Sequence, residues 1–183
     1  WVDRVPDSRL YLAIAAIVTV ICAALCRRGW AEMRRLKQGR DGERIVGQVL
    51  QSLDLPGLRV YHDVPADGFN LDHVVVCERG IYVVETKTWS KRAREKLRTS
   101  NGRIFLGNRP APGDAVGQAA AEARWIRELL VRATGVPYRC QPVVAVPGWY
   151  RERMDAATKS IAWVLEPKAL RGWIERDKIC LSL

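Results

Sequence analysis

The sequence predicts an α/β protein whose mixed sheet is flanked by helices and preceded by a single N-terminal transmembrane helix. Two observations support this fold class. Residues 10–26 form an apolar run without a charged residue, and the rest of the chain alternates strand-like and amphipathic helical patterns. A chain of 183 residues is long enough for one domain with a sizeable core in addition to such a helix.

The apolar run LYLAIAAIVTVICAALC predicts a membrane anchor. A helix of this length spans roughly 25 Å, close to the ~30 Å hydrocarbon core of a bilayer. A helix buried in a soluble protein would leave a polar face, and this run has none. A cleaved signal peptide would end in small residues, whereas this run ends in Arg27 and Arg28. We therefore expect a transmembrane helix over 10–27, after a short non-cytoplasmic tail over 1–9.

Positive charge next to the run predicts its orientation. Residues 27–40 contain six Lys or Arg and one acidic residue, whereas residues 1–9 contain two basic and two acidic residues. Segments rich in Lys and Arg stay on the cytoplasmic side of a membrane. We expect a single-pass membrane protein with a basic juxtamembrane linker over 28–40 and a cytoplasmic domain over 41–183.

The overall composition narrows the function classes. A formal net charge of +10 favours polyanionic partners, either nucleic acid or an anionic membrane surface. The five cysteines are an odd number without CxxC or CxxH spacing, so neither a disulfide framework nor a zinc site is indicated. A GxxxxGK[ST] phosphate loop is absent from the sequence, so ATP hydrolysis is not indicated.

The soluble part begins with a predicted helix and three predicted strands. Residues 38–53 carry apolar side chains at spacings of three and four, which is a helical stripe. Residues 58–64 (LRVYHDV) then predict a first strand. The segment 71–89, LDHVVVCERGIYVVETKTW, supplies the second and third strands, which are joined through Glu78-Arg79-Gly80.

A basic stretch with Asn101-Gly102 and PAPG follows, and it predicts a loop or an irregular hairpin. Asp114 is a good N-cap for a second helix over 115–133, whose apolar stripe runs from Val116 to Leu130. Residues 140–149 predict a fourth strand and residues 157–165 contain a fifth. A short closing helix is expected over 167–175.

Three charged residues in the predicted hairpin have no structural purpose there. With a turn centred on Glu78 and Arg79, Asp72 lies opposite Glu85, with Cβ atoms roughly 4.5–5.5 Å apart. Side chains alternate along a strand, so Lys87 shares this face with Glu85 while His73 points to the other. We expect His73 to be packed and hydrogen-bonded.

Two carboxylates that face each other on a sheet repel, and a divalent cation between them would remove the repulsion. Carboxylate oxygens are hard ligands that suit Mg²⁺ or Mn²⁺. The alternative is a surface face that carries a Glu85–Lys87 pair and a rim Asp72, and the spacing alone does not decide between them.

The same residues resemble a known family. Asp72 followed by Glu85-Thr86-Lys87 resembles the D…(D/E)xK signature of the PD-(D/E)XK nuclease superfamily. Three segments in order are similar to its nuclease-related domain (NERD): GRDGERIVGQVL, LDHVVVCERGIYVVETKTW, and Gln118 early in the second helix. The likeness covers residues 38 to about 165, and it implies a restriction-endonuclease-like fold.

The resemblance implies catalytic roles at five positions, namely Glu43, Asp72, Glu85, Lys87 and Gln118. Asp72 and Glu85 would hold Mg²⁺ (or Mn²⁺) together with the backbone of Thr86, and Lys87 would assist the attacking water. Glu43 would reach the site from the first helix, although it could instead favour the N-terminus of that helix through its dipole. Gln118 would position the site or contact phosphate, or it could be a solvated helix residue.

Basic residues follow the signature directly: Lys91, Arg92, Arg94, Lys96 and Arg98. They could bind phosphates in a sequence-independent, salt-sensitive way. A solvated basic loop and contact with lipid headgroups are the alternatives. Trp89 could stack on an unpaired base, but we expect it to lie in the core or at its rim.

Taken together, these features predict a membrane-anchored, Mg²⁺-dependent nuclease that hydrolyses phosphodiester bonds of nucleic acid, with DNA favoured over RNA. The alternative is a non-catalytic module that binds nucleic acid or protein and is tethered at the membrane. Cleavage under Mg²⁺, or its absence despite binding, separates the two.

Overall fold

The structure, a computed structural model, describes residues 8–91, 95–150 and 152–178. It divides into two compact units, Trp1–Gln38 and Gly39–Leu183. The helix α1 (Ser8–Gln51) begins in the first unit and ends in the second. Residues 28–40, which we predicted as a linker, are helical and belong to α1.

The first part of α1 has the properties of a membrane span. Among the described residues, α1 is the one helix long and apolar enough to cross a membrane. Its apolar window is 0% buried inside the protein. Exposed apolar side chains are costly in water, so the sequence-based expectation of a helix that could span a bilayer agrees with this part of the structure.

The second unit is built around a mixed five-stranded sheet in the order β1-β2-β3-β7-β8. The strands are β1 (Arg59–Pro65), β2 (Asn70–Cys77), β3 (Gly80–Thr86), β7 (Cys140–Ala145) and β8 (Trp163–Leu165). β1, β2 and β3 are antiparallel neighbours, whereas β7 is parallel to β3 and β8 is parallel to β7. This arrangement confirms the prediction of a mixed sheet.

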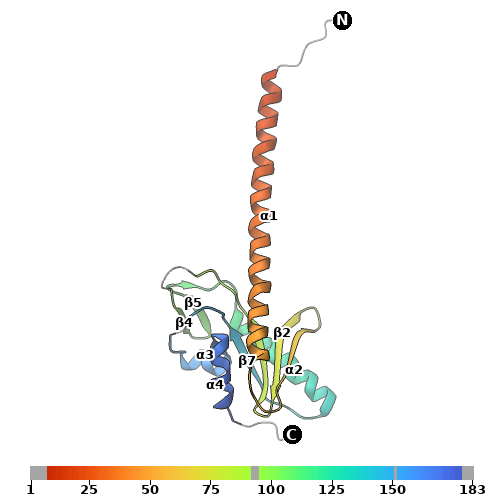
Figure 1. Cartoon of the computed structure of the whole chain (residues 1–183), viewed down its shortest axis with the longest axis vertical. Helices are drawn as coiled ribbons and strands as arrows, with labels where there is room; N and C mark the ends of the chain where they lie inside the picture. The colour runs from red at the N-terminus through yellow and green to blue at the C-terminus, as the bar shows by residue number, and fades with distance from the viewer. Residues whose placement is uncertain (1–7, 92–94, 151, 179–183) are drawn as a thin grey trace. The chain divides into compact units, whose positions relative to one another are not determined.

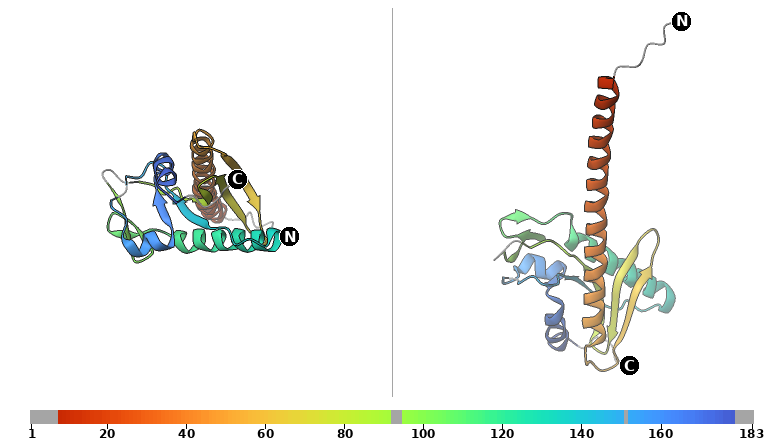
Figure 2. Two further views of the ribbon diagram at one scale, coloured as in Figure 1. Left: turned by 90° about the horizontal axis from the view of Figure 1, so that it is seen from below. Right: turned by 45° about the horizontal axis from the view of Figure 1, so that its top comes forward.

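Helices cover both faces of this sheet (Figures 1 and 2). Residues 39–51 of α1 pack on one face through Val46 and Leu50, which contact a core that includes Val75, Tyr82 and Val84. α2 (Ala115–Thr134) packs on the other face, where its Ala123 and Ile126 share a cluster with Val74, Ile81 and Val83. The left view of Figure 2 shows α2 running along one side of the strands.

The helix caps follow local chemistry. The Asp114 side chain accepts a hydrogen bond from the backbone N–H of Gly117 at 2.9 Å, so the predicted N-cap of α2 is confirmed. The short helix η1 (Pro167–Ala169) and α4 (Leu170–Glu175) form the predicted closing segment. The buried residues of α2 end at Ile126. Leu129, which we expected on the buried stripe, is 38% exposed.

Two elements go beyond the prediction. The stretch expected to be a loop or irregular hairpin forms a second sheet of three strands, β4 (Leu97–Ser100), β5 (Arg103–Leu106) and β6 (Arg109–Pro110). Asn101 and Gly102 have positive φ angles of 48° and 77°, which makes the tight β4–β5 turn possible. A helix, α3 (Ala156–Ile161), precedes β8, with the Asp155 side chain capping it through Thr158 N–H.

Gly42 allows α1 to approach the end of β3 closely. A Cβ atom added at Gly42 would overlap the methyl carbon of Thr88, which follows β3. Gly39, three residues earlier in the same helix, has open space where its Cβ would lie. Gly42 is therefore required by packing, whereas Gly39 is not.

We expect Gly42→Ala to lower the free energy of unfolding by about 1–3 kcal/mol, because the new methyl group overpacks the contact with Thr88. Gly39→Ala is the matched control and should stabilise the helix by roughly 0.5–1 kcal/mol. Thr88→Ser removes the methyl group of Thr88. The double variant Gly42→Ala/Thr88→Ser should therefore recover most of the stability that Gly42→Ala loses. Thermal unfolding of the full chain in detergent measures all four proteins, and a Gly42→Ala variant as stable as Gly39→Ala would contradict this packing account.

Candidate active site

The register of the β2–β3 hairpin brings two carboxylates together. The pairing runs from Cys77 with Gly80 to His73 with Val84, as predicted. One step further along the same ladder, Asp72 lies opposite Glu85. Both side chains are on the α2 face of the sheet, because they alternate with residues that pack toward α1.

Backbone and side-chain contacts fix these two carboxylates. One oxygen of Asp72, Oδ2, accepts a hydrogen bond from the backbone N–H of Thr86 at 2.7 Å. Glu85 is only 3% exposed, and its Oε1 forms an ion pair with Nζ of Lys87 at 2.5 Å. Asp72, Glu85 and Lys87, which the sequence placed on one face, are thus held in one connected group.

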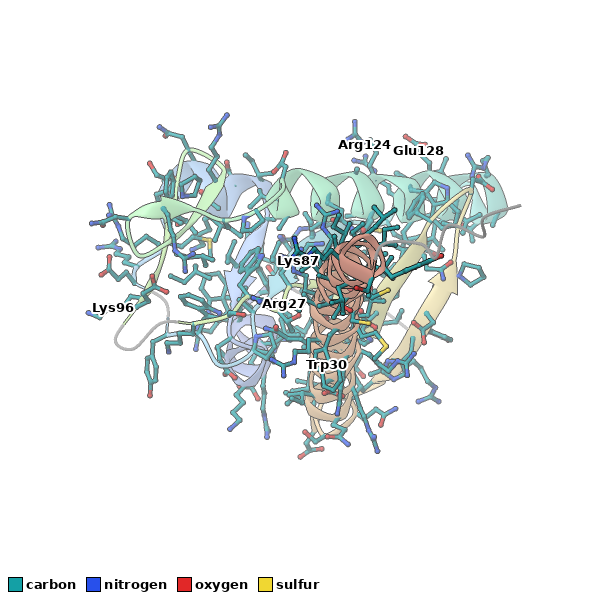
Figure 3. All side chains as sticks on the ribbon, turned by 90° about the horizontal axis from the view of Figure 1, so that it is seen from above. Arg27, Trp30, Lys87, Lys96, Arg124 and Glu128 are labelled. Carbon is teal, nitrogen blue, oxygen red and sulfur yellow. The ribbon has the colours of Figure 1, made fainter. Side chains whose placement is uncertain are left out.

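Two residues of α2 complete the group. Nζ of Lys87 donates to Oε1 of Gln118 at 2.8 Å, and Nε2 of Gln118 donates to Oε1 of Glu122 at 2.9 Å. Figure 3 shows Lys87 on the sheet side of α2, with Arg124 and Glu128 projecting from the opposite side. Gln118 is exposed on α2 yet bonded to both Lys87 and Glu122, and its role in positioning the site or contacting phosphate stays a prediction.

Glu122 is a site residue that the sequence reading missed. It is 3% exposed, and its Oε2 and the Oε2 of Glu85 are both buried without a hydrogen-bond partner among the described residues. The negative charge of Glu122 contributes to the raised pKa of Glu85. A signal existed, because Glu122 sits on the apolar stripe of α2 three residues after Ala119 and four after Gln118.

Burial raises the pKa of each carboxyl group in this cluster. Desolvation, together with the charge of the neighbouring Glu85, raises the pKa of Asp72 to about 7. Desolvation also raises the pKa of Glu85 to about 7, against the stabilising effect of Lys87. The pKa of Glu122 is raised by desolvation too, in spite of the hydrogen bond from Gln118. The cluster thus brings three carboxyl groups with raised pKa values together with one lysine.

The donor set of this cluster fits a hard divalent cation. Asp72 and Glu85 offer carboxylate oxygens, and Thr86, which directly follows Glu85, offers a backbone carbonyl. Oε2 of Glu85 is buried without a hydrogen-bond partner among the described residues, so it is open to a further ligand. Within residues 8–91, 95–150 and 152–178, however, groups of three or more His, Cys, Asp or Glu side chains that could hold a metal ion are absent. A cation here would therefore depend on two carboxylates, backbone oxygen and ligands from outside the chain.

Glu43 lies next to this cluster without a direct bond to it. Its side chain is half-buried on α1, and its negative charge contributes to the raised pKa of Asp72. It also lines a pocket of about 390 Å³ with Arg40, Arg44 and both histidines. Glu43 thus acts on the predicted site through charge.

The two histidines are bonded to each other. Nδ1 of His62 and Nδ1 of His73 are 2.8 Å apart, and Nε2 of His62 lies 2.9 Å from the amide nitrogen of Gln51. Burial, together with the charge of the neighbouring His62, lowers the pKa of His73 to about 4. The expectation of a packed, hydrogen-bonded His73 is confirmed.

The basic residues after the signature lie elsewhere. Arg92 and Arg94 are outside the described residues. Nζ of Lys91 donates to the carbonyl of Gly148 at 3.1 Å and lies 5.6 Å from the ring centre of Trp149. Lys96 and Arg98 each form an ion pair with Glu152, at 3.9 and 3.6 Å. Figure 3 shows Lys96 well apart from Lys87, so the structure does not bring this basic segment into the carboxylate cluster.

Trp89 lies where the sequence led us to expect it, at the rim of the core. It is partly buried against the main apolar cluster, and its carbonyl accepts a hydrogen bond from Nε1 of Trp149 at 3.1 Å. Both contacts hold it in the fold.

Comparison with known proteins places the chain in a family. The model of the nuclease-related domain (NERD) family matches residues 38–147, which include every residue of the cluster. The chain belongs to the nuclease-related domain family. An uncharacterized protein of Bacillus anthracis is 37% identical over 57 residues, which cover 28% of this chain and 27% of that protein. The chain thus spans about a quarter of the curated relative that it matches. No solved structure matches the chain.

We expect Glu122→Gln to raise the thermal midpoint of this NERD protein at pH 8 in the presence of a chelator. The folded-state pKa values of the cluster are raised, so their protonation stabilises the fold at acid pH, and this stability is lost as the pH rises through about 7. The neutral amide removes one repulsive charge and can donate toward Glu85, a gain of roughly 1–3 kcal/mol.

The difference between Glu122→Gln and the wild type should shrink toward pH 5, because Asp72 and Glu85, whose pKa values are raised to about 7, are protonated there. Glu128→Gln, a change on the exposed side of the same helix, is the control and should shift stability by less than about 0.5 kcal/mol. A destabilised Glu122→Gln variant at pH 8 would show that the charge of Glu122 is compensated in the fold.

Proposed function

We propose that this NERD chain is a membrane-anchored, metal-dependent nuclease of the PD-(D/E)XK type that hydrolyses phosphodiester bonds, with DNA as its substrate. The observation that carries the proposal is the gathering of Asp72, Glu85 and Lys87 at one end of the hairpin, bonded to α2 through Gln118. The mixed sheet between two helical layers supports a restriction-endonuclease-like fold.

Asp72 and Glu85, with the backbone carbonyl of Thr86, would hold Mg²⁺ (or Mn²⁺). Bound there, the ion would supply Lewis-acid activation of water and neutralise charge on the phosphate. The raised pKa values of the two carboxyl groups support this assignment, because a dication would favour their ionised forms.

The chain's own residues would orient the reaction. Lys87 keeps one ammonium proton on Gln118 and one on Glu85, so its charge stays beside the carboxylates. A developing negative charge on a phosphate oxygen next to it would be stabilised by this fixed ammonium group. Glu122 acts on Gln118, and through it on Lys87, as a positioning residue. The backbone N–H of Thr86 holds Oδ2 of Asp72 in place. The second carboxylate oxygen of Asp72 can accept a further partner.

Phosphates away from the cleaved bond would be bound by the basic segment 91–98. Lys96 and Arg98 are 65% and 55% exposed at their side chains, and Glu152 offsets only part of their charge. Such contacts are sequence-independent and weaken with salt. The net charge of +10 supports a polyanionic substrate.

The apolar part of α1 would anchor the enzyme in a membrane through residues 10–27, with the NERD domain in the cytoplasm. The apolar window of α1, of which 0% is buried inside the protein, supports the anchor. The six basic residues at 27–40 support this orientation, because Lys and Arg are retained on the cytoplasmic side.

One feature favours the alternative function, a non-catalytic module that binds nucleic acid or protein at the membrane. Lys87 already pairs with Glu85, so part of the charge is neutralised without a metal ion. In this case the chain would bind nucleic acid in a salt-dependent manner and leave it intact with Mg²⁺ or Mn²⁺.

We expect the full chain in detergent micelles to cut DNA with Mg²⁺ and to lose this activity in EDTA. Glu85→Gln and Lys87→Met should each lower the rate by about 10²-fold or more, because each removes a charged group from the reacting centre. Glu175→Gln, which alters an exposed ion pair on α4, is the control and should keep the wild-type rate. Full activity in either site variant would remove the site assignment.

Metal binding can be measured without catalysis. At pH 8, Mg²⁺ or Ca²⁺ at a hundred times its dissociation constant should stabilise the wild type by about 2.7 kcal/mol. The rise in the thermal midpoint should be lost in Asp72→Asn and Glu85→Gln and kept in Glu175→Gln. An equal rise in all four proteins would place the cation elsewhere.

A further inference from the structure

A pocket of about 520 Å³ opens beside the carboxylate cluster, between α2 and the β1–β2 turn. Gln118 and Glu122 form the side that it shares with the cluster, and Phe69 and Trp125 form an aromatic wall. Its volume is typical of pockets for small ligands, which range from about 300 to 1,000 Å³. Whatever fills this pocket lies directly next to the site.

The aromatic wall is held in place by contacts between the turn and α2. The rings of Phe69 and Trp125 meet edge to face, with centroids 5.8 Å apart. Nε1 of Trp125 lies 3.5 Å from Oδ2 of Asp67 in the same turn. Phe69 nevertheless stays 39% exposed at the tip of a hairpin, where a polar residue is usual. The fold leaves an aromatic surface open to a ligand.

The polar part of the pocket selects the class of ligand. Glu122 and Glu128 outweigh Arg124, so a phosphate group would be repelled. A purely apolar ligand would displace water from the exposed Gln118 amide without replacing its hydrogen bonds. The amide of Gln118 has two N–H donors and an oxygen with two lone pairs, and its bonds to Lys87 and Glu122 use one of each. The ligand must therefore carry no phosphate in the pocket, must be polar in part, and must pair with the amide of Gln118. A flat, neutral ring with donors and acceptors at its edge meets these conditions.

We propose that this pocket, lined by Phe69, Trp125, Gln118 and Glu122, binds an unpaired nucleobase next to the phosphate in the carboxylate cluster. The proposal rests on the proposed nuclease function and deepens it. The base stacks on the aromatic wall, and Gln118 contacts its edge. The backbone phosphates of the same strand stay outside the pocket, where the acidic residues do not face them.

The consequence is a substrate preference. A base inside this pocket has left its partner and its neighbours in a duplex, which costs more free energy for a paired base than for one already unpaired. Single-stranded nucleic acid therefore binds more tightly than duplex, whereas the exposed basic segment binds both through phosphates.

The test uses a single-stranded DNA oligonucleotide that carries 2-aminopurine, a fluorescent base whose emission is quenched by stacking. The full chain in detergent is titrated in EDTA, so that cleavage plays no part. We expect quenching, and an affinity about tenfold or more above that for the same oligonucleotide in a duplex. Phe69→Ala should weaken single-strand binding about tenfold, as expected for the loss of one base–aromatic stack, and Phe69→Tyr should restore it.

Tyr61→Ala supplies the matched control, because Tyr61 is an exposed aromatic residue on β1 outside the pocket lining. It should bind as the wild type does. Thermal midpoints of the variants verify that each is folded, and Trp125→Phe tests the second ring with less disturbance than an alanine. Equal affinity for single strand and duplex, binding without quenching, or unchanged binding in Phe69→Ala would each overturn the proposal.

The two proposals fail in different ways. Quenching that depends on Phe69, without any cleavage under Mg²⁺, would keep the base pocket and reject the nuclease. Cleavage of duplex and single strand at the same rate, with no effect of Phe69→Ala, would keep the nuclease and reject the pocket.

Discussion

The candidate site of the NERD domain depends on the burial of carboxyl groups where the central hairpin meets α2. Asp72, Glu85 and Glu122 lose water on folding, and one lysine offsets only part of their charge. Leaving buried charges uncompensated costs several kcal/mol. A fold selected for stability alone would place apolar side chains at these positions, so the cost indicates that the cluster serves a function.

The sheet makes this burial possible because its other positions are apolar. Cores on both faces, one toward residues 39–51 of α1 and one toward α2, hold the strands that carry Asp72 and Glu85. The close contact at Gly42 fixes the end of β3, where the Glu85-Thr86-Lys87 signature lies. α2 connects the antiparallel part of the sheet to the parallel strand β7, and this path brings Gln118 to Lys87.

The carboxylate cluster and the basic segment lie on different parts of the domain. The carboxylates and the aromatic pocket share α2, whereas Lys91, Lys96 and Arg98 are tied to residues 148–152. A nucleic-acid strand carries both kinds of chemistry, since its phosphates are anionic and its bases are neutral and flat. In the function we propose, the basic segment attracts the backbone, and the pocket and the cluster act on one nucleotide.

The sequence by itself determined the local features of this protein. Apolar patterns placed the strands and helices, alternation in the hairpin put Asp72, Glu85 and Lys87 on one face, and Asp114 marked the start of α2. Only the tertiary structure decided that Glu122 joins the cluster, that Phe69 meets Trp125, and that the basic segment lies apart. These contacts link residues far apart in the chain, and their geometry depends on how helices pack on the sheet, which local patterns do not encode. Periodicity within one helix could mark Glu122 as a polar residue on a buried stripe, but its partner Glu85 lies on another element.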